Sequence, residues 1–254
     1  MKKKPLFIAF TNQKGGVGKS AITVLMASYF HYLRSSHVLV VDCDYPQHSI
    51  HGMRERDKES ILKSESYRQL LMAQYERIAK KSYPILKAEP ADALQSVERY
   101  IKESGQEFDL VFFDLPGTVS TAGVLTTLFN MDWVFIPVVS DRMVMQSSMV
   151  FASSLRSYLD HHPEAPLKGV WLFWNRVQPR SSQEVFAQYN DLMKELHINV
   201  FATTLPDSPR YSRELSNSAG KPFFRCTVHP PMPKLLEGSR LEEFANEMAT
   251  LVNL

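Results

Sequence analysis

Residues 10–20 read FTNQKGGVGKS, and this stretch decides the expected fold. Three glycines lie within four positions, with one lysine just before them and one just after. Glycine frees the backbone to turn its N–H groups toward an anion, and a helix beginning near residue 19 would add its positive end. The apolar run PLFIAF (residues 5–10) precedes the loop and is typical of a buried parallel strand. A strand, a glycine loop and a helix predict a phosphate-binding site.

The rest of the chain alternates between strand and helix patterns. Further strands are expected within 37–44, 107–117, 132–140, 167–177 and 198–207, and helices within 20–36, 91–104, 143–158 and 183–196. This alternation predicts an α/β fold, a three-layer sandwich with a twisted, mostly parallel sheet. Residues 1–254 are expected to form a single domain with a charged helical insertion around 52–81.

The composition is that of an ordinary globular protein. Hydrophobic residues make up 44% and charged residues 22%, and the net charge is +2, so an anionic partner must be met by a local patch. No stretch approaches the ~18 apolar residues that a membrane span needs. The two cysteines, Cys43 and Cys226, indicate neither a disulfide framework nor a zinc site. We therefore expect a cytoplasmic protein.

The glycine loop departs from the usual phosphate loop in one place. That pattern needs a glycine five places before Gly18, where this chain has Gln13. The chemistry is retained, because Lys19 can reach the β/γ-phosphates and Ser20 can offer its hydroxyl to Mg²⁺. The stretch KGGVGKS resembles the deviant Walker A motif of the ParA/MinD family of P-loop ATPases. The resemblance covers most of the chain and includes VVDCDYPQ (40–47), FFDLPG (112–117) and NRV (175–177).

The resemblance implies that ATP and Mg²⁺ are the ligands of this loop. In the family the first lysine of the motif, here Lys14, crosses a dimer interface to the partner's nucleotide, while Lys19 binds the phosphates in its own subunit. Both lysines are therefore expected to be catalytic, in a homodimer that forms on ATP binding. The nucleotide-binding residues expected are Lys14, Gly15, Gly16, Val17, Gly18, Lys19, Ser20, Ala21, Asn175, Pro206 and Asp207.

Acidic residues follow two of the expected strands. Asp42 and Asp44 end one strand and Asp114 ends another, and ligands of open α/β sheets bind at that edge. Asp114 is expected to hold Mg²⁺ through water and Asp42 to support the ion's hydration shell, together with the Ser20 hydroxyl. By resemblance, Asp44 orients the attacking water. The alternative is that these aspartates only cap loops and helices.

Two residues depart from the family pattern D-x-D-P-Q, which a glycine often follows. Tyr45 separates Asp44 from the proline, and His48 stands where the glycine often is. We expect Tyr45 to shift the switch loop. Gly117 of DLPG would give the backbone room near the γ-phosphate in the second switch.

The stretch NRVQ (175–178) bears on the choice of base. GTPases carry N-K-x-D, whose aspartate reads guanine, and here Gln178 takes that place. This favours adenine, with Asn175 as the contact and with Pro206 and Asp207 in the neighbouring loop. The alternative is an ordinary surface turn.

Basic residues are in local excess between 201 and 240. Proteins of the ParA type bind DNA non-specifically as ATP-bound dimers through basic residues of their carboxyl-terminal third. The residues expected to do so are Arg210, Arg213, Lys221, Arg225 and Arg240. The alternative is a solvated surface. Because no room for a helix-turn-helix precedes the first strand, sequence-specific binding is expected of a partner.

The last segment, SRLEEFANEMATLVNL (239–254), bears on membrane binding. MinD-like proteins end in a basic amphipathic helix that lies on membranes. From residue 241 onward this segment carries three glutamates and no basic residue. Anionic lipid would repel it, so we expect a helix docked on the core and no membrane partner.

These features predict a ParA-type ATPase that partitions or positions a plasmid or other mobile element. Hydrolysis is expected to be slow and stimulated by a partner, either ParB-like or part of a transfer apparatus, with the protein nucleoid-associated. YFHYL (29–33), VVDCDYPQHSI (40–50) and MRERD (53–57) resemble the TraA proteins of Bacteroides-type conjugative transposons. Conjugative transfer is therefore one alternative, a nucleotide-gated regulator with negligible turnover is another, and MinD-like membrane positioning is a third.

Overall fold

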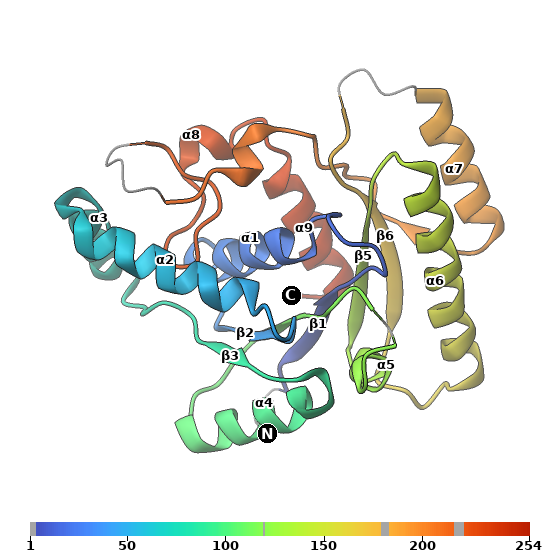
Figure 1. Cartoon of the computed structure of the whole chain (residues 1–254), viewed down its shortest axis with the longest axis horizontal. Coiled ribbons are helices and arrows are strands. Elements are labelled where there is room, and N and C mark those ends of the chain that lie inside the picture. The colour runs from blue at the N-terminus through green and yellow to red at the C-terminus, as the bar shows by residue number, and fades with distance from the viewer. Residues whose placement is uncertain (1–3, 119, 179–182, 216–220) are drawn as a thin grey trace.

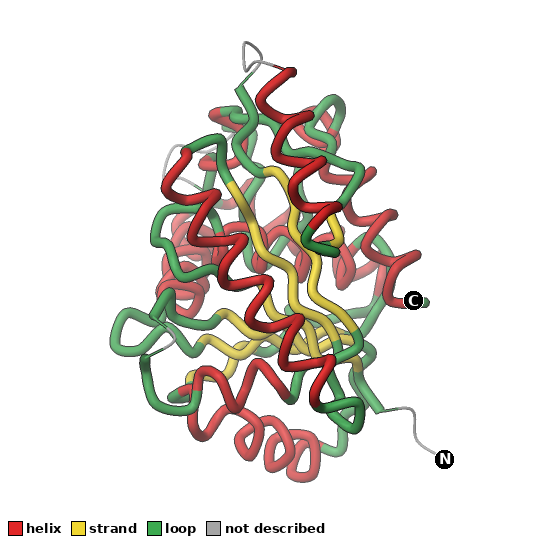
Figure 2. Tube along the Cα trace, turned by 90° about the vertical axis from the view of Figure 1, so that its right-hand side faces the viewer, coloured by secondary structure: helices red, strands yellow, loops and turns green. Residues whose placement is uncertain are grey.

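A parallel sheet runs through the centre of the protein, with helices on both of its faces (Figure 1, Figure 2). The computed structural model describes residues 4–118, 120–178, 183–215 and 221–254. The sheet has seven strands in the order β3-β2-β4-β1-β5-β6-β7, and every pair is parallel. The strands are β1 (Leu6–Phe10), β2 (Val38–Asp42), β3 (Ile85–Lys87), β4 (Leu110–Asp114), β5 (Trp133–Val138), β6 (Gly169–Trp174) and β7 (Asn199–Val200). The predicted α/β sandwich is confirmed.

The helices connect successive strands and cover the sheet. They are α1 (Lys19–Tyr32), α2 (Ser49–Lys63), α3 (Glu65–Ile78), α4 (Ala93–Ser104), α5 (Val124–Phe129), α6 (Arg142–His161), α7 (Gln183–Glu195), α8 (Pro233–Leu236) and α9 (Leu241–Val252). Two 3₁₀ turns, η1 (Pro90–Asp92) and η2 (Pro209–Ser212), lie in loops. Among the residues that the structure describes, no helix is both long and apolar enough to span a membrane.

The strands form because their apolar side chains point alternately to the two faces. In β1, Phe7 and Ala9 join the core beneath α4, α5, α6 and α7, whereas Ile8 and Phe10 join the core beneath α1, α2 and α9. Strand β1 pairs with both β4 and β5, so it is central. The glycine loop that follows β1 therefore lies in the middle of the carboxyl edge of the sheet.

Two strands differ from the sequence prediction. The edge strand β3 was not predicted, because its three residues carry no periodic pattern. The run predicted as a strand over 198–207 is regular only at Asn199–Val200. Beyond that point the chain turns along the carboxyl edge and returns to the glycine loop, where Val177 and Pro206 form an isolated bridge.

Helices α2 and α3 are attached to the carboxyl-terminal third by buried polar contacts. Arg54 of α2 donates to the Thr227 hydroxyl at 2.8 Å and to the Tyr83 and Thr227 carbonyls at 2.9 and 3.0 Å. Asp57 accepts from the Thr227 N–H and hydroxyl at 2.7 and 2.6 Å. Gln74 of α3 donates to the Val228 carbonyl at 3.0 Å. These contacts fix the proline-rich segment 226–232.

The last helix is docked on the core, as predicted. Leu241, Phe244 and Met248 of α9 are fully buried against the face of the sheet that α1 also covers. The Glu247 carboxylate of α9 accepts hydrogen bonds from the backbone N–H groups of Ala202 and Thr203, at 2.7 and 2.8 Å. Helix α9 thus holds the segment after β7, which passes close to the glycine loop in space.

Candidate functional site

The glycine loop adopts a conformation that other residues would strain. Gly16 and Gly18 lie in the left-handed region, with φ of 74° and 96°. A Cβ on Gly18 would also stand 2.6 Å from the Asn175 amide nitrogen. Helix α1 begins directly after this loop and directs its free N–H groups toward it. The loop therefore has the geometry of a preformed anion site.

Lys19 lies beneath the loop rather than in solvent. Its Nζ donates to the Lys14 carbonyl at 3.3 Å. Burial lowers the pKa of Lys19, and the nearby Asp114 and Asp44 carboxylates oppose that shift. A Cβ on Gly117 would stand 3.2 Å from the same Nζ, so the second switch loop passes directly beside the lysine. The structure thus brings Lys19, Asp44, Asp114 and Gly117 together.

The two strand-end carboxylates lie side by side. Asp42 and Asp114 are partners in the register of β2 and β4, and both are fully buried. Among the described residues, neither oxygen of Asp114 has a hydrogen-bond partner. Burial raises the pKa of Asp114 to about 7, the charges of Asp42 and Asp44 add to the shift, and Ser20 and Lys19 oppose it. Asp114 is thus a fully buried carboxyl that adjoins Ser20, Lys19 and Asp42.

Asp42 is held more firmly than Asp114. Its Oδ2 accepts from the His51 backbone N–H at 2.8 Å, whereas its Oδ1 has no hydrogen-bond partner among the described residues. Burial raises its pKa, and the His51 hydrogen bond opposes that shift. The imidazole Nδ1 of His48 lies 3.8 Å from Oδ1 and 3.0 Å from the Asp42 backbone oxygen. One oxygen of Asp42 is therefore committed to α2 and the other is not.

The carboxylates of Asp42 and Asp114 fit a magnesium ion that would bind together with the phosphates of a nucleotide. Among the described residues no three His, Cys, Asp or Glu side chains converge on a metal position. Mg²⁺ suits such a site, because it keeps several waters and binds one or two carboxylates plus substrate phosphates. Ser20 and the free oxygens of Asp114 and Asp42 are the groups that would hold it.

The switch loop after β2 places Tyr45 outward. Its side chain is 59% exposed, and its ring lies 5.8 Å from the His48 ring. Asp44 is half-buried, and its backbone oxygen accepts from the His48 N–H at 2.8 Å. The extra residue is accommodated by a tight turn while Asp44 remains close enough to affect the pKa of Lys19.

Lys14 differs from Lys19 in its surroundings. Its backbone N–H donates to the Asn12 side chain at 3.1 Å and its carbonyl accepts from Lys19. Its half-buried side chain makes no hydrogen bond or ion pair with the residues that the structure describes. The loop thus fixes the backbone of Lys14 and leaves its ammonium group unpaired within the described part of the chain.

A cavity of about 390 Å³ opens beside the glycine loop. Asn175, Pro206 and Asp207, which were predicted to bind the nucleotide, line it together with Gly16, Gly18 and Ala21. Asn175 is also a support of the loop, since its amide donates to the Val17 carbonyl at 2.7 Å. Sequence reasoning missed further lining residues, which are Ile22, Arg176, Ser208, Pro209, Tyr211, Ser212 and Arg225.

Comparison with known proteins agrees with this geometry. The sequence profile of the CobQ/CobB/MinD/ParA nucleotide binding domain matches residues 8–220. The chain belongs to this family. The predicted ParA/MinD kinship is confirmed, and the closer resemblance to TraA stays a prediction. A search of curated proteins gives no significant match.

Solved structures of similar fold span nearly the whole chain. A proposed plasmid partition protein from Borrelia burgdorferi B31, bound to AMPPNP, has a TM-score of 0.60 at 15% identity and covers 99% of each chain. An aspartate-to-alanine variant of McdA from Cyanothece, in complex with ATP, has a TM-score of 0.59 at 14% identity, covering 98% of this chain and 97% of its own. Cobyrinic acid a,c-diamide synthase from Mycobacterium smegmatis, with ADP and magnesium, has a TM-score of 0.54 at 20% identity, covering 82% and 89%. At such identities the likeness establishes the fold.

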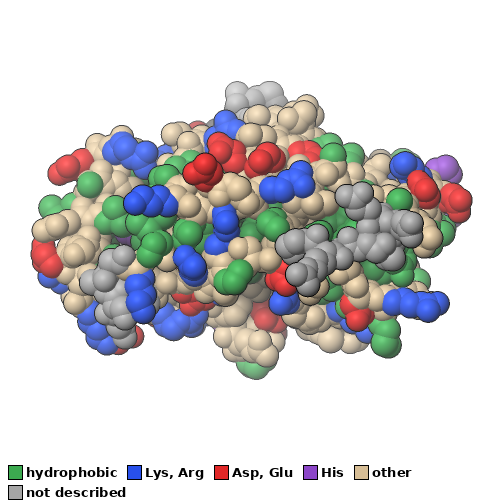
Figure 3. All heavy atoms as spheres, turned by 90° about the horizontal axis from the view of Figure 1, so that it is seen from above, with side chains coloured by type: hydrophobic (Ala, Val, Ile, Leu, Met, Phe, Trp, Pro, Cys, Tyr) green, Lys and Arg blue, Asp and Glu red, His purple; other side chains and the backbone are tan. Residues whose placement is uncertain are grey.

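The five residues predicted to bind DNA fall into two groups within this family fold. Arg210 donates to the Leu235 and Glu237 carbonyls at 2.9 and 2.6 Å, and Arg225 donates to Glu214 at 2.7 Å. Arg240 donates to the Thr204 hydroxyl at 3.0 Å but is exposed. Arg213 and Lys221 are exposed, and their side chains pair with none of the described residues. Basic and acidic side chains are interspersed on the face that Figure 3 shows.

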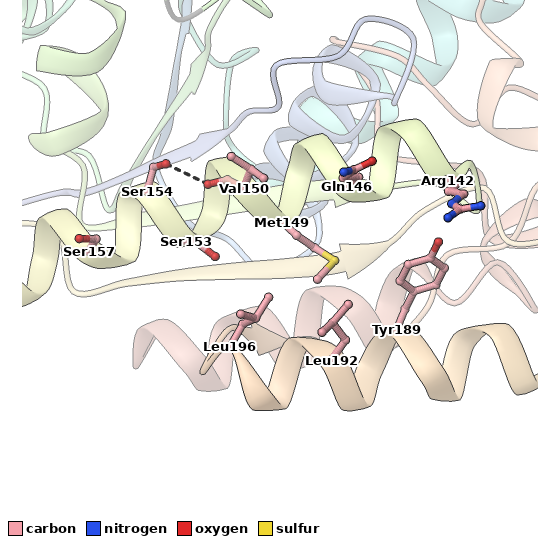
Figure 4. A pocket seen from close by; sticks show the side chains of 10 residues that line it. All are labelled: Arg142, Gln146, Met149, Val150, Ser153, Ser154, Ser157, Tyr189, Leu192 and Leu196. Carbon is pink, nitrogen blue, oxygen red and sulfur yellow. Dashed lines mark hydrogen bonds between the residues drawn. The ribbon is translucent and has the colours of Figure 1, made fainter.

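A larger cavity, of about 860 Å³, lies away from the nucleotide site (Figure 4). It is a groove between α6 and α7, in which Met149, Leu192 and Leu196 face one another below a row of α6 serines. Among its described lining residues, Arg142 at one end is the only cation. The described lining of this groove contains no carboxylate and no glycine loop, so its larger volume does not make it the phosphate site.

Proposed function

We propose that the protein is an ATPase of the ParA type that acts as an ATP-dependent dimer to partition or position a plasmid or mobile element. The observation that carries the ATPase assignment is the fully buried Asp114, which has no hydrogen-bond partner among the described residues and adjoins Ser20 and Lys19 at a preformed glycine loop. A buried carboxyl without partners is costly, and such groups concentrate at functional sites.

Adenine rather than guanine is supported by residue 178. Gln178 lines a small cavity with Arg176 and Asp207, at the place where a GTPase would carry its guanine-reading aspartate. The three structural neighbours bound AMPPNP, ATP and ADP with magnesium, which supports ATP and Mg²⁺ as the ligands of this chain.

Each residue of the site has a place in phosphoryl transfer. Ser20, Asp114 and Asp42 would hold Mg²⁺, which would supply positive charge to neutralise the phosphates. Lys19 would neutralise the β/γ-phosphates, and the Gly117 backbone, with no side chain in the way, would approach the γ-phosphate. Asp44 would orient the attacking water, because positioning supplies most of the catalysis in this reaction. Tyr45 would tune that position from the switch loop.

Dimerisation is assigned to Lys14. Its ammonium group is unpaired among the described residues although its backbone is fixed. The phosphates of a partner's nucleotide would supply the opposite charge that this ammonium group lacks. ATP binding and association of two subunits would then be coupled.

Non-specific DNA binding is proposed for the exposed basic residues Arg213, Lys221 and Arg240 of the dimer, with Arg210 and Arg225 more strongly engaged within the chain. A partner of ParB-like character or from a transfer apparatus would stimulate hydrolysis on nucleoid DNA in the cytoplasm. Only the TraA-like motifs favour conjugative transfer over partition. A nucleotide-gated regulator would differ from a partition ATPase because a partner would not stimulate its ATP hydrolysis. Membrane positioning is disfavoured because α9 is acidic and docked.

Two lysine variants test the proposal. Lys19→Ala should abolish ATP binding, because it removes the phosphate contact within the subunit. Lys14→Ala should retain measurable ATP binding and lose ATP-dependent dimers and turnover. Equilibrium binding of ATP and light scattering measure both properties, with the exposed Lys58→Ala as a control for loss of charge. Equal loss of binding in both variants would contradict the cross-dimer role of Lys14.

DNA binding has its own test, by titration at several salt concentrations. If about three basic residues per subunit contact phosphates, a dimer neutralises about six, and the log–log slope of affinity against salt is about −5. Arg213→Glu should weaken binding to all sequences alike, because phosphate contacts carry no sequence information. Binding that ignores ATP or salt would contradict this part of the proposal.

A further inference from the structure

One arginine reaches the nucleotide cavity from a distant part of the chain. Arg225 lines the 390 Å³ cavity together with Gly18, Ala21 and Pro206. Its Nη2 donates to Glu214 at 2.7 Å, and only 20% of its side chain is exposed. Its Nε is buried and has no partner among the described residues. The side chain therefore lines a cavity that begins at the phosphate loop, and its unpaired Nε lies behind the surface of that cavity.

The backbone around Arg225 is fixed on both sides. Its own N–H donates to the Arg213 carbonyl at 2.9 Å, and the Thr227 N–H donates to Asp57 at 2.7 Å. Asp57 belongs to α2, which begins directly after the switch loop. Arg225 is thus held in a set position by the same helix that holds Asp42 through the His51 N–H.

The residues that line the cavity indicate which part of a nucleotide would bind in it. It includes Gly16 and Gly18 of the loop and the next residues of α1, but neither Lys19 nor Asp114. The cavity therefore extends from the loop away from the magnesium and γ-phosphate end. What lies in that direction in a bound nucleotide is the ribose and the base.

We propose that Arg225 is a nucleoside-binding residue, whose guanidinium contacts the ribose or base of the bound nucleotide while Glu214 holds it in place. The proposal rests on the ATPase function proposed above. A guanidinium suits this role because its donors lie in a rigid plane that can also stack on a base. Arg225 thus moves from the predicted DNA surface to the nucleotide pocket.

A purely structural ion pair explains less of the geometry. Glu214 already has a second basic partner, Arg56, at 3.4 Å on the outer side of the protein. The Arg56 side chain is 60% exposed, whereas Arg225 is turned inward, and of these two arginines only Arg225 carries a buried donor that no described residue pairs. Of these two arginines, only Arg225 lines the cavity.

The experiment compares the two arginines that share Glu214. Arg225→Gln, Arg225→Lys and Arg56→Gln are each titrated with MgATP and with magnesium tripolyphosphate, which lacks the nucleoside. We expect Arg225→Gln to weaken MgATP binding about tenfold, since about 1.4 kcal/mol corresponds to tenfold in affinity, and to leave tripolyphosphate binding within about twofold of wild type. Arg225→Lys keeps the charge but loses the planar guanidinium, and should resemble Arg225→Gln. Arg56→Gln should bind both ligands like wild type.

The two ligands separate a contact from a structural effect. Equal weakening of MgATP and tripolyphosphate in Arg225→Gln, or wild-type MgATP affinity in Arg225→Lys, would overturn the assignment of Arg225 and leave the ATPase proposal intact. Wild-type protein that binds neither ligand would contradict the proposed function and this inference with it.

Discussion

Two buried charged clusters of this protein differ in how their polar atoms are satisfied. Asp57 lies beneath α2 and accepts two hydrogen bonds from Thr227, while Arg54 beside it donates three. Asp114 lies at the end of β4, equally buried, and neither of its oxygens has a partner among the described residues. Burial raises the pKa of both carboxyls. The difference teaches that burial alone does not mark function; what sets Asp114 apart is that it lacks partners and also adjoins Ser20 and Lys19 of the glycine loop.

The largest expected effect is on hydrolysis. Asp114→Asn should lower the rate of ATP hydrolysis about a thousandfold, the scale seen when one preorganised electrostatic group is lost. Because the asparagine is neutral, the protein should fold as well as wild type. Steady-state phosphate release measures the rate, and exposed Asp160→Asn serves as the control. An unchanged rate of hydrolysis would contradict the assignment of Asp114 to the functional site.

The next effect is on stability, at the other cluster. Asp57→Ala should lower the free energy of unfolding by about 3 kcal/mol, because two hydrogen bonds to a charged acceptor are lost and the Thr227 donors are left buried. Denaturant unfolding measures it. Glu55→Ala, on the exposed face of the same helix, should change nothing measurable. A wild-type stability for Asp57→Ala would show that the satisfied cluster is not structural.

A smaller effect is the pH dependence of stability. Since the pKa of Asp114 is about 7 in the folded protein and ordinarily 3.8, the folded state holds a proton that the unfolded chain releases between these values. Stability therefore falls as pH rises from about 4 to about 7, by at most about 1.4 kcal/mol per pH unit. Unfolding at about pH 5 and about pH 7, without nucleotide, should show a shallower slope in Asp114→Asn than in wild type, because only the raised pKa values of Asp42 and Asp57 remain. Parallel pH profiles would contradict it.

The smallest effect concerns Asp42, which lies between the two cases. One oxygen accepts from the His51 N–H and the other is free among the described residues. Asp42→Asn should keep the helix contact through its amide oxygen and slow hydrolysis about tenfold, below the usual losses for a group that acts directly in the reaction. The same phosphate-release assay applies. If Asp42→Asn lost as much hydrolytic rate as Asp114→Asn, Asp42 would have to be as important for hydrolysis as Asp114.

Local sequence predicted the parts of the site that local backbone builds. The glycine loop, Lys19 and Ser20 are contiguous, and Asp42 and Asp114 could be placed together because both end buried parallel strands. The edge strand β3 was missed because three residues set no period. Arg225 was assigned to DNA because only its charge is visible in sequence. Its inward position depends on Thr227 contacts with α2, 170 residues away in the chain.

The docked position of α9 has a mechanical consequence for the base-binding end of the site. Glu247 accepts hydrogen bonds from the N–H groups of residues 202 and 203. The segment 202–207 that begins there continues to Pro206, which lines the cavity. Its far end is tied by the Leu205 and Asp207 N–H groups, which donate to the Trp174 and Val177 carbonyls at 2.8 Å each. A regulator that displaced α9 from the sheet would remove the Glu247 hydrogen bonds and make segment 202–207 more mobile. It would thereby lower nucleotide affinity allosterically, without contacting the nucleotide.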